Sequence, residues 1–302
     1  MKKKVYILGG GITGLACAYE LLKHGHSVEI IEKSSTVGGL ARTETWKGKP
    51  IDMGPHIYHT PDEDIKNYLL TEFEGLFYER DHWAKNFKNG QFYDYPISRE
   101  FINSLPKKTR DKINTELDEA NPDDLSKANN YYEYTKALAG ETLQELFFTK
   151  YPEKLWGIPT KDLDANWAPK RVQITEERRA FYQDQWSAVG NEGSGTILRS
   201  LEKKVNSLGG TINLEETIEQ IKLNNNHNIT NIITDARHID LMPKDIVINT
   251  TSCTNFSRFI GFETNLKYRG VILVMLEIST AKVLPNGVDF IYVDDPEIFF
   301  NR

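Results

Sequence analysis

Apolar residues at the start of the chain predict a strand, an amphipathic helix and a second strand, in that order. Val5 to Leu8 is a short apolar run, typical of a buried parallel strand. Apolar side chains then recur at helical spacing from Leu15 to Leu22, and Gly25 ends this helix. Val28 to Ile31 forms the next apolar run. The pattern therefore indicates a βαβ unit.

The middle of the chain has a different pattern. Residues Phe87 to Ile97 predict a hairpin that turns at Asn89 and Gly90. From Glu100 to about Leu146 the pattern is helical and strongly charged, with prolines as breaks. This region is expected to be a helical substrate domain with solvated faces.

The last third of the sequence predicts a return to the first domain. Thr196 to Leu208 has helical spacing, and the strands expected after it are Thr211 to Leu214, Ile218 to Leu223, Ile229 to Thr234 and residues 245–250. A further apolar run, Val271 to Leu276, has the length of a strand. The fold class expected from these patterns is α/β.

Composition limits the function classes. The 302 residues are 39% hydrophobic, enough for a sizeable core in one large or two ordinary domains. Lys and Arg total 37 against 43 Asp and Glu, a net charge of −6, so no basic excess points to nucleic acid or an anionic membrane surface. No apolar run approaches the roughly twenty residues of a membrane span. We therefore expect a soluble, cytoplasmic protein.

The chain start and the cysteines add two expectations. MKKK followed by VYIL imitates a signal peptide, but the glycine turn interrupts the apolar run, so we interpret it as the first strand. Cys17 and Cys253 offer no disulfide framework, which suits a reducing compartment, and both are expected in or near the core. His56 and His59 lack further ligands nearby, so no metal site is predicted.

The turn between the first strand and helix has the pattern G-x-G-x-x-G at Gly9, Gly11 and Gly14. Gly9 permits a tight turn, Gly11 lets the backbone approach a pyrophosphate, and Gly14 lets the helix pack closely on the strand. The helix N-terminus supplies amide donors for phosphate. Glu32 follows the second strand, where it can accept from ribose hydroxyls. Together these features predict dinucleotide binding.

Residues 32–43 and 52–56 resemble the extended FAD signature of amine oxidases, protoporphyrinogen oxidases and UDP-galactopyranose mutases. A second glycine pair, Gly38 and Gly39, permits close approach to a cofactor, and Arg42 can meet phosphate with a bidentate fork. The cofactor-binding residues expected from motif and resemblance are Gly9, Gly11, Ile12, Thr13, Gly14, Glu32, Lys33, Gly39, Leu40, Arg42, Gly54, Pro55, His56 and Ile218.

Residues 147–172 resemble the segment of UDP-galactopyranose mutases that lines the nucleotide-sugar site. The resemblance implies that Trp156 stacks on uracil and Arg171 clamps the diphosphate, as an indole face and a guanidinium are suited to do. Trp167 is interpreted as a packing residue. The pair Tyr95-Pro96 matches the tyrosine beside the substrate, although a hairpin-core tyrosine is an equal reading. Arg302 matches a second diphosphate arginine.

In this family the histidine corresponding to His56 lies against the flavin ring, although here Pro55 replaces a glycine and stiffens the turn. The catalytic residues that the resemblance implies are His56, Arg171 and Arg302. It implies domains at 1–86 (FAD-binding, first part), 87–190 (inserted helical and mixed-sheet substrate domain), 191–260 (Rossmann-like FAD-binding, second part) and 261–302 (second substrate-sheet segment). The family continues beyond this point, so a fragment, or a second chain that completes the site, is expected.

The resemblance implies a flavin-dependent isomerase that interconverts UDP-galactopyranose and UDP-galactofuranose, or a close analogue, for cell-surface polysaccharide. Reduced FAD then provides covalent catalysis without net redox change. NAD(P)H is a possible reductant, and a homo-oligomer is possible. Two alternatives stay open: an FAD-dependent oxidoreductase of the amine-oxidase or protoporphyrinogen-oxidase type, and a noncatalytic or split-chain nucleotide-binding module.

Overall fold

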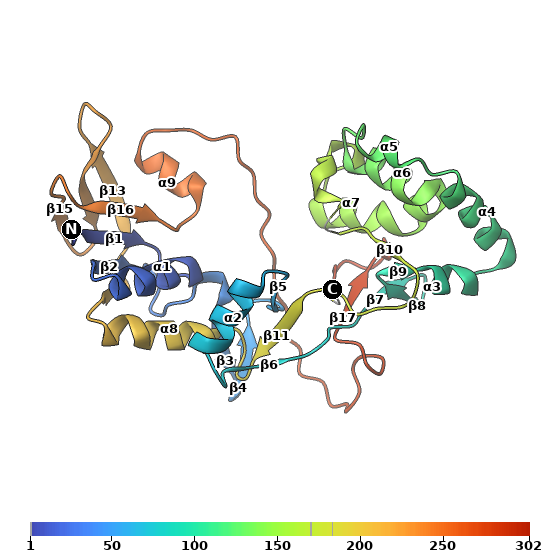
Figure 1. The fold of residues 1–302 in the computed structure, drawn as a ribbon, viewed down its shortest axis with the longest axis horizontal. Coiled ribbons are helices and arrows are strands. Elements are labelled where there is room, and N and C mark those ends of the chain that lie inside the picture. The colour runs from blue at the N-terminus through green and yellow to red at the C-terminus, as the bar shows by residue number, and fades with distance from the viewer. Residues whose placement is uncertain (1, 170, 183) are drawn as a thin grey trace. The chain divides into compact units, whose positions relative to one another are not determined.

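The computed structural model describes residues 2–169, 171–182 and 184–302. The chain forms two compact units (Figure 1). The first unit comprises residues 1–80 and 186–275, and the second comprises residues 81–185 and 276–302. The domain boundaries expected from the sequence lie after residues 86, 190 and 260. The first two fall a few residues after the boundaries in the structure, and the third falls fifteen residues before its counterpart.

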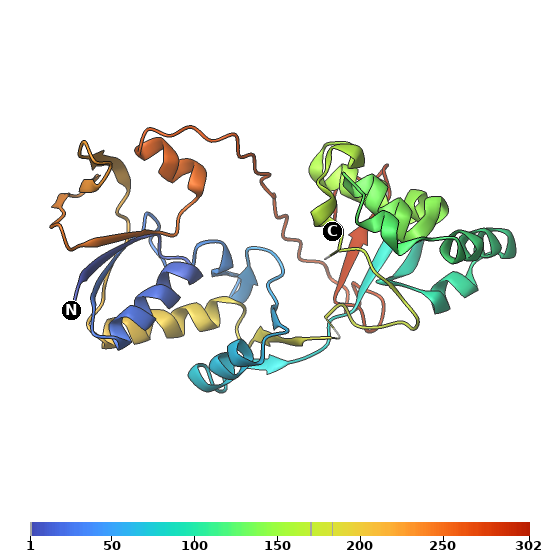
Figure 2. The same ribbon diagram turned by 45° about the horizontal axis from the view of Figure 1, so that its top comes forward.

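A parallel sheet lies at the centre of the first unit, with strand order β12-β2-β1-β16. Its strands are β1 (Lys4–Leu8), β2 (Ser27–Ile31), β12 (Thr211–Asn213) and β16 (Ile246–Asn249). Helices α1 (Ile12–Lys23) and α8 (Gly195–Ser207) lie side by side on one face (Figure 2). Val5 and Ile7 face these helices, whereas Tyr6 and Leu8 face the opposite apolar layer. Burial on both faces explains the continuous apolar runs of these strands.

The opposite layer is an antiparallel sheet of β13 (Ile218–Leu223), β14 (Ile229–Thr234) and β15 (His238–Asp240), with α9 (Cys253–Phe259) packed near it. The rest of the unit consists of short elements. These are η1 (Gly39–Ala41), the hairpin β3 (Thr43–Trp46) and β4 (Lys49–Asp52), α2 (Glu63–Glu72), and a sheet of β5 (Tyr58–Thr60), β11 (Trp186–Gly190) and β6 (Phe77–Glu79).

The second unit places helices against a small sheet of order β17-β7-β8. Strands β7 (Ala84–Lys88) and β8 (Gln91–Tyr95) form the expected hairpin, and β17 (Phe290–Val293) pairs with β7 in parallel. Asn89 and Gly90 have φ values of 51° and 76°, as a two-residue turn with two left-handed positions requires. β9 (Ile97–Ser98) and β10 (Ile174–Thr175) form a separate pair.

The expected helical region is present as α3 (Arg99–Ser104), α4 (Lys107–Asp118), α5 (Pro122–Leu125) and α6 (Tyr131–Leu143). A π-helix, η2 (Gln144–Phe148), leads into α7 (Lys150–Trp156). Two short turns follow, η3 (Thr160–Asp162) and η4 (Ala165–Trp167). Apolar side chains from these helices and from β9 form a separate core in the second unit, which includes Ile97, Ile102 and Leu143.

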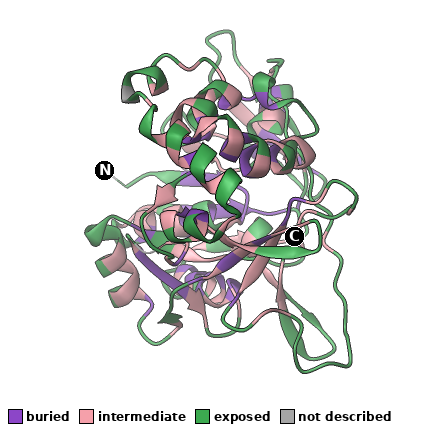
Figure 3. Ribbon diagram, turned by 90° about the vertical axis from the view of Figure 1, so that its right-hand side faces the viewer, coloured by how far each residue is buried: buried purple, intermediate pink, exposed green. Residues whose placement is uncertain are grey.

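Two expectations were wrong. Residues 262–278, which include the apolar run Val271 to Leu276, form no helix or strand, and Ile272 is 92% exposed. Cys253 is exposed at the start of α9 rather than near the core, whereas Cys17 is half-buried. Buried residues lie along the strands and inner helix faces, and exposed ones follow the connecting segments (Figure 3). Among the described helices, none combines the length and apolarity needed to cross a bilayer.

Candidate functional site

The glycine turn after β1 leaves room for a ligand at one position and none at another. Gly9 has a φ of 102°, which favours glycine. A Cβ on Gly14 would lie 2.1 Å from the Gly9 carbonyl oxygen, so only glycine fits where α1 packs on the turn. A Cβ on Gly11 would meet no atom within 4 Å. The backbone at Gly11 therefore borders open space, where a phosphate can approach.

The N-terminus of α1 is the source of amide donors at this turn. The helix begins at Ile12, and Gly11 before it provides no side-chain cap. The first amides, from Ile12 to Gly14, have no acceptor within the helix, and the helix dipole makes this end partially positive. Ile12 itself is 40% exposed. The turn thus has the chemistry of an anion site built from backbone.

The second glycine pair packs directly on the first turn. The Gly38 N–H donates to the Gly10 carbonyl at 2.8 Å, and a Cβ on Gly39 would lie 3.3 Å from Gly11 Cα. Arg42 Nη1 donates to the Gly39 carbonyl at 3.0 Å, and its Nε donates to Glu44 at 2.5 Å. Arg42 is thereby held at the second turn with its charge already paired. Leu40 beside it is 82% exposed.

Glu32 ties the turn to the end of β2. Its Oε2 accepts from the Gly10 N–H at 2.6 Å, and its Oε1 accepts from the Ser34 N–H at 2.9 Å. Each carboxylate oxygen keeps a lone pair for a further donor such as a ribose hydroxyl. Lys33 is exposed. The Glu216 N–H donates to the Glu32 carbonyl at 3.0 Å, which brings the start of β13, with Ile218, beside Glu32.

His56 follows a turn in which Gly54 has a φ of 107° and Pro55 is exposed. The Nδ1 atom of His56 is buried and has no hydrogen-bond partner among the described residues. A buried polar atom without a partner loses its hydration without compensation, and a bound ligand group or a water molecule would restore it. This orphaned nitrogen and the open space at Gly11 both fit a bound dinucleotide.

One support of this site was not expected from the sequence. Asp52 at the end of β4 accepts from the Ser194 N–H at 3.0 Å and from the Thr43 hydroxyl. The Ser194 Oγ donates to the Ala41 carbonyl at 2.6 Å. The glycine-rich loop before α8 therefore fixes the turn at residues 39–41. The tight contacts of its glycines with Thr43 explain why this loop contains them.

The second unit contains an aromatic cavity of about 50 Å³. Strands, helices and turns far apart in the sequence all contribute to its wall. The lining residues are Asn86, Tyr95, Tyr131, Phe147, Phe148, Tyr151, Pro152, Leu155, Trp167, Arg171, Val172, Phe181, Tyr292 and Arg302. Three of the predicted substrate residues, Tyr95, Arg171 and Arg302, thus lie at one cavity.

Arg171 is positioned by its backbone and by an aromatic ring. Its N–H donates to the Ala168 carbonyl at 2.8 Å, and its guanidinium carbon lies 5.5 Å from the centre of the Trp167 ring. The Tyr95 hydroxyl donates to the Arg171 carbonyl. Burial, reinforced by nearby tyrosines, raises the pKa of Tyr95 well above its usual range, although Arg171 opposes this rise. Tyr95 therefore stays a neutral hydrogen-bond donor.

Arg302 comes to the same cavity from the other end of the unit. Its guanidinium carbon lies 5.4 Å from the centre of the Tyr292 ring on β17. Tyr292 is itself in edge-to-face contact with Tyr95, with ring centres 5.1 Å apart. Arg171 and Arg302 are exposed over part of their surface, although both line the cavity.

The two tryptophans of this segment lie differently with respect to the cavity. Trp167 lines the cavity, whereas Trp156, at the end of α7, lies outside its lining and is 39% exposed. The rings meet edge to face with centres 5.8 Å apart. Sequence reasoning also missed Tyr131, Tyr151 and Tyr292, because nothing in their local pattern separates a cavity tyrosine from a core tyrosine.

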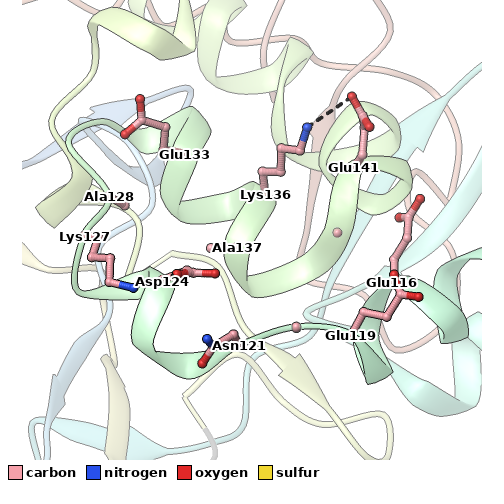
Figure 4. A pocket seen from close by; sticks show the side chains of 12 residues that line it. Glu116, Glu119, Asn121, Asp124, Lys127, Ala128, Glu133, Lys136, Ala137 and Glu141 are labelled. Atoms are coloured by element: carbon pink, nitrogen blue, oxygen red, sulfur yellow. Dashed lines mark hydrogen bonds and ion pairs between the residues drawn. The ribbon is translucent and has the colours of Figure 1, made fainter.

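A larger hollow in the second unit, of about 530 Å³, has the opposite charge (Figure 4). Carboxylates from α4, α5 and α6 surround it, among them Glu116, Asp124 and Glu133. Of its lysines, Lys136 is paired with Glu141 at 3.4 Å. This acidic surface does not suit a diphosphate. The part of the chain that the structure describes contains no cluster of three or more metal-ligating His, Cys, Asp or Glu residues.

Comparisons with known proteins agree with the fold. Residues 7–71 match the family model of the NAD(P)-binding Rossmann-like domain. A crystal structure of reduced UDP-galactopyranose mutase superposes with a TM-score of 0.69 at 21% identity, over 85% of this chain and 57% of that one. The expected fold class, a Rossmann-like domain with an inserted helical and mixed-sheet domain, is thus confirmed.

Two curated relatives are similar in sequence. A probable UDP-galactopyranose mutase of Klebsiella pneumoniae is 29% identical over 54% of this chain, and the dTDP-fucopyranose mutase of Escherichia coli is 27% identical over 72%. The chain spans 44% and 59% of their lengths. The chain is therefore similar to these mutases in sequence, and it contains a Rossmann-like domain. A 4,4'-diapolycopene oxygenase of Methylomonas is 28% identical over 52% of the chain and 30% of its own length.

Proposed function

We propose that this chain binds FAD in its first unit and a pyrimidine nucleoside diphosphate sugar in its second, as part of a flavin-dependent sugar mutase. The substrate is UDP-galactopyranose or UDP-galactofuranose, or a close analogue such as a dTDP-sugar. The names of the two mutase relatives support this class. The observation that carries the proposal is the presence of Arg171 and Arg302 at one aromatic cavity.

FAD fits the residues of the first unit. The amides at Ile12 and Thr13 would hold the pyrophosphate. Glu32 would accept hydrogen bonds from the ribose hydroxyls, and Ile218 lies beside Glu32, where the adenosine half of FAD would bind. The orphaned Nδ1 of His56 would gain a partner from the bound cofactor. When bound and reduced, the flavin would supply a nucleophile for covalent catalysis without net redox change.

The second unit offers a phosphate site with an aromatic rim. Its cavity, at about 50 Å³, is far smaller than the roughly 300 Å³ of a typical small-molecule pocket. It would therefore hold a phosphate group, neutralised by Arg171 and Arg302, while the rest of the nucleotide lies at the exposed rim. Trp156, with its exposed indole at this rim, would stack on the pyrimidine.

The roles of these side chains would be binding and placement. Two guanidinium groups lower the cost of charge that develops on a departing diphosphate. Tyr95 stays protonated, so it acts as a donor and as a brace for the Arg171 backbone rather than as a base. No acid or base among the described residues is assigned to the sugar.

The direct test is an anaerobic assay with dithionite-reduced FAD and UDP-galactofuranose, followed by separation of the furanose and pyranose products. Conversion to the pyranose is expected from the full-length, flavin-loaded protein. A parallel assay with dTDP-fucofuranose identifies the preferred base and sugar. A flavin-loaded protein that converts neither substrate would contradict mutase activity.

The alternative of an FAD-dependent oxidoreductase is favoured by one observation, the similarity to carotenoid oxygenases. An apolar substrate gives no reason for two arginines at an aromatic cavity. Calorimetry with UDP separates the alternatives, because micromolar binding supports a nucleotide-sugar site. A purified protein without visible flavin absorbance would instead favour a noncatalytic module or one that needs a second chain.

A further inference from the structure

The segment that carries Arg302 forms a closed loop after β17. The Val293 N–H donates to the Asn301 carbonyl at 2.9 Å, so the two ends of the loop are joined. The side chain of Lys154, on α7, contacts the backbone of this loop. Its Nζ donates to the carbonyls of Val293 at 3.2 Å, Asp295 at 3.0 Å and Phe300 at 2.8 Å. An ammonium group has three N–H donors, so this one ammonium is fully used by the loop.

The same helix also forms the wall of the aromatic cavity. Tyr151 and Leu155 of α7 line the cavity, whereas Lys154 between them does not. Burial lowers the pKa of Lys154, an effect that Asp294 and Asp295 oppose. The helix is therefore joined to the cavity on one side and to the loop on the other.

A second anchor holds the start of the loop on β7. The Asp294 N–H donates to the Phe87 carbonyl at 2.9 Å, and the Asp294 carboxylate accepts from Lys88 Nζ at 3.2 Å. Asp294 is only 1% exposed. Asp295 accepts from the Asn89 N–H at 3.0 Å. With the start of the loop fixed on β7, its far end is held by the Val293–Asn301 backbone bond and by Lys154, which is bonded to the Phe300 carbonyl two residues before Arg302.

We propose that Lys154 is a positioning residue for ligand binding: it holds the loop 293–301 so that the Arg302 guanidinium lies at the cavity, over Tyr292. This inference rests on the proposed function, in which Arg302 binds the diphosphate. Lys154 itself does not contact the ligand. Its loss would free the three loop carbonyls and move Arg302 away from Arg171.

The first test is UDP binding by calorimetry to the full chain and to K154M. We expect about tenfold weaker binding for K154M, equivalent to ~1.4 kcal/mol. The matched control is K150M on the same helix, because Lys150 is exposed and forms an ion pair with Glu153 at 3.3 Å, away from the loop. K150M should bind within about twofold of the wild type. Equal binding by K154M and wild type would overturn the proposal.

A double-mutant cycle separates positioning from general loss of structure. If Lys154 acts through Arg302, then K154M added to R302Q should weaken binding no further than R302Q alone. Additive losses would overturn the proposal. If K154M does not fold, K154Q, which keeps two N–H donors, takes its place in the cycle. Failure of the wild type to bind UDP or dTDP would instead contradict the proposed function.

Discussion

In the proposed function, the two candidate sites would recognise phosphate by different means. In the first unit the candidate phosphate-binding groups are backbone atoms. They lie in turns whose glycines pack too closely for a side chain. In the second unit the groups are side chains, which strands, helices and turns from residue 86 to residue 302 bring to one cavity. Substitutions in the first unit should therefore act sterically, by adding side-chain atoms to a closely packed turn. Those in the second should act through charge.

The largest expected effect separates two glycines of the same turn. G14A would place a Cβ 2.1 Å from the Gly9 carbonyl, so we expect the first unit to lose at least about 3 kcal/mol of stability. G11A meets open space and should leave stability within about 0.5 kcal/mol while FAD binding is lost. Thermal unfolding and flavin content measure both. Equal stability of the two variants would contradict the assignment of Gly14 to packing.

In the second unit, R171Q should weaken UDP binding by about thirtyfold, near 2 kcal/mol, because it removes a charge from the cavity proposed to hold phosphate. The fold should be unchanged, since Arg171 is exposed. R110Q is the control, because Arg110 pairs with Asp111 at 3.2 Å on α4 and does not line the cavity. Calorimetry at two salt concentrations checks the charge effect. Similar losses in both variants would point to long-range charge instead of a local contact.

This difference also explains which site could be predicted from the sequence. The candidate site of the first unit lies mostly within one βαβ segment, so the spacing of Gly9, Gly11 and Gly14 and the place of Glu32 were enough to propose it. The strand limits of β13 and β14 agree with the periodicity as well. The contact between Asp52 and Ser194 was missed, because it joins residues 142 positions apart and has no local pattern.

The cavity of the second unit was predicted only in part. The resemblance predicted Tyr95, Arg171 and Arg302 at the substrate site. The roles that it gave to Trp156 and Trp167 depend on which of the two indoles faces the cavity. That choice is set by the packing of η4 against α6, where Trp167 meets Tyr131 with ring centres 5.1 Å apart. Asp294 and Lys154 were not noticed, since single charged residues near a strand or in a helix are usually solvated.

One carboxylate in each unit predicts a pH dependence of stability, and the two dependences have opposite signs. Burial raises the pKa of Asp294 in the second unit to about 6, although Lys88 opposes the rise. A folded pKa above the ordinary value of 3.8 means that the folded state keeps the proton longer. Stability should therefore fall by about 2 kcal/mol as pH rises from about 4 to 6. D294N should remove this slope in urea unfolding, and an unchanged slope would contradict the assignment.

Glu72 of α2, in the first unit, behaves in the opposite way. A hydrogen bond from Tyr19, at 2.7 Å, and one from Lys204, at 2.9 Å, lower its pKa to about 2. Its stabilisation is complete above pH 4.5 and is lost as pH falls towards 2. Solvent screening limits E72Q to a loss of about 1 kcal/mol at neutral pH. The exposed Glu63 supplies the control E63Q, which should change stability by less than about 0.5 kcal/mol at neutral pH.

The smallest expected effect concerns the apolar run from Val271 to Leu276. Ile272 is 92% exposed, so I272K removes almost no buried surface and should change the stability of the chain by less than about 0.5 kcal/mol. The buried Ile7 is its reference, because I7A should cost about 2–5 kcal/mol. Analytical ultracentrifugation of I272K adds a second reading. If the exposed run drives self-association, the added charge should reduce it. A loss above about 1 kcal/mol in I272K would show instead that this run is packed in solution.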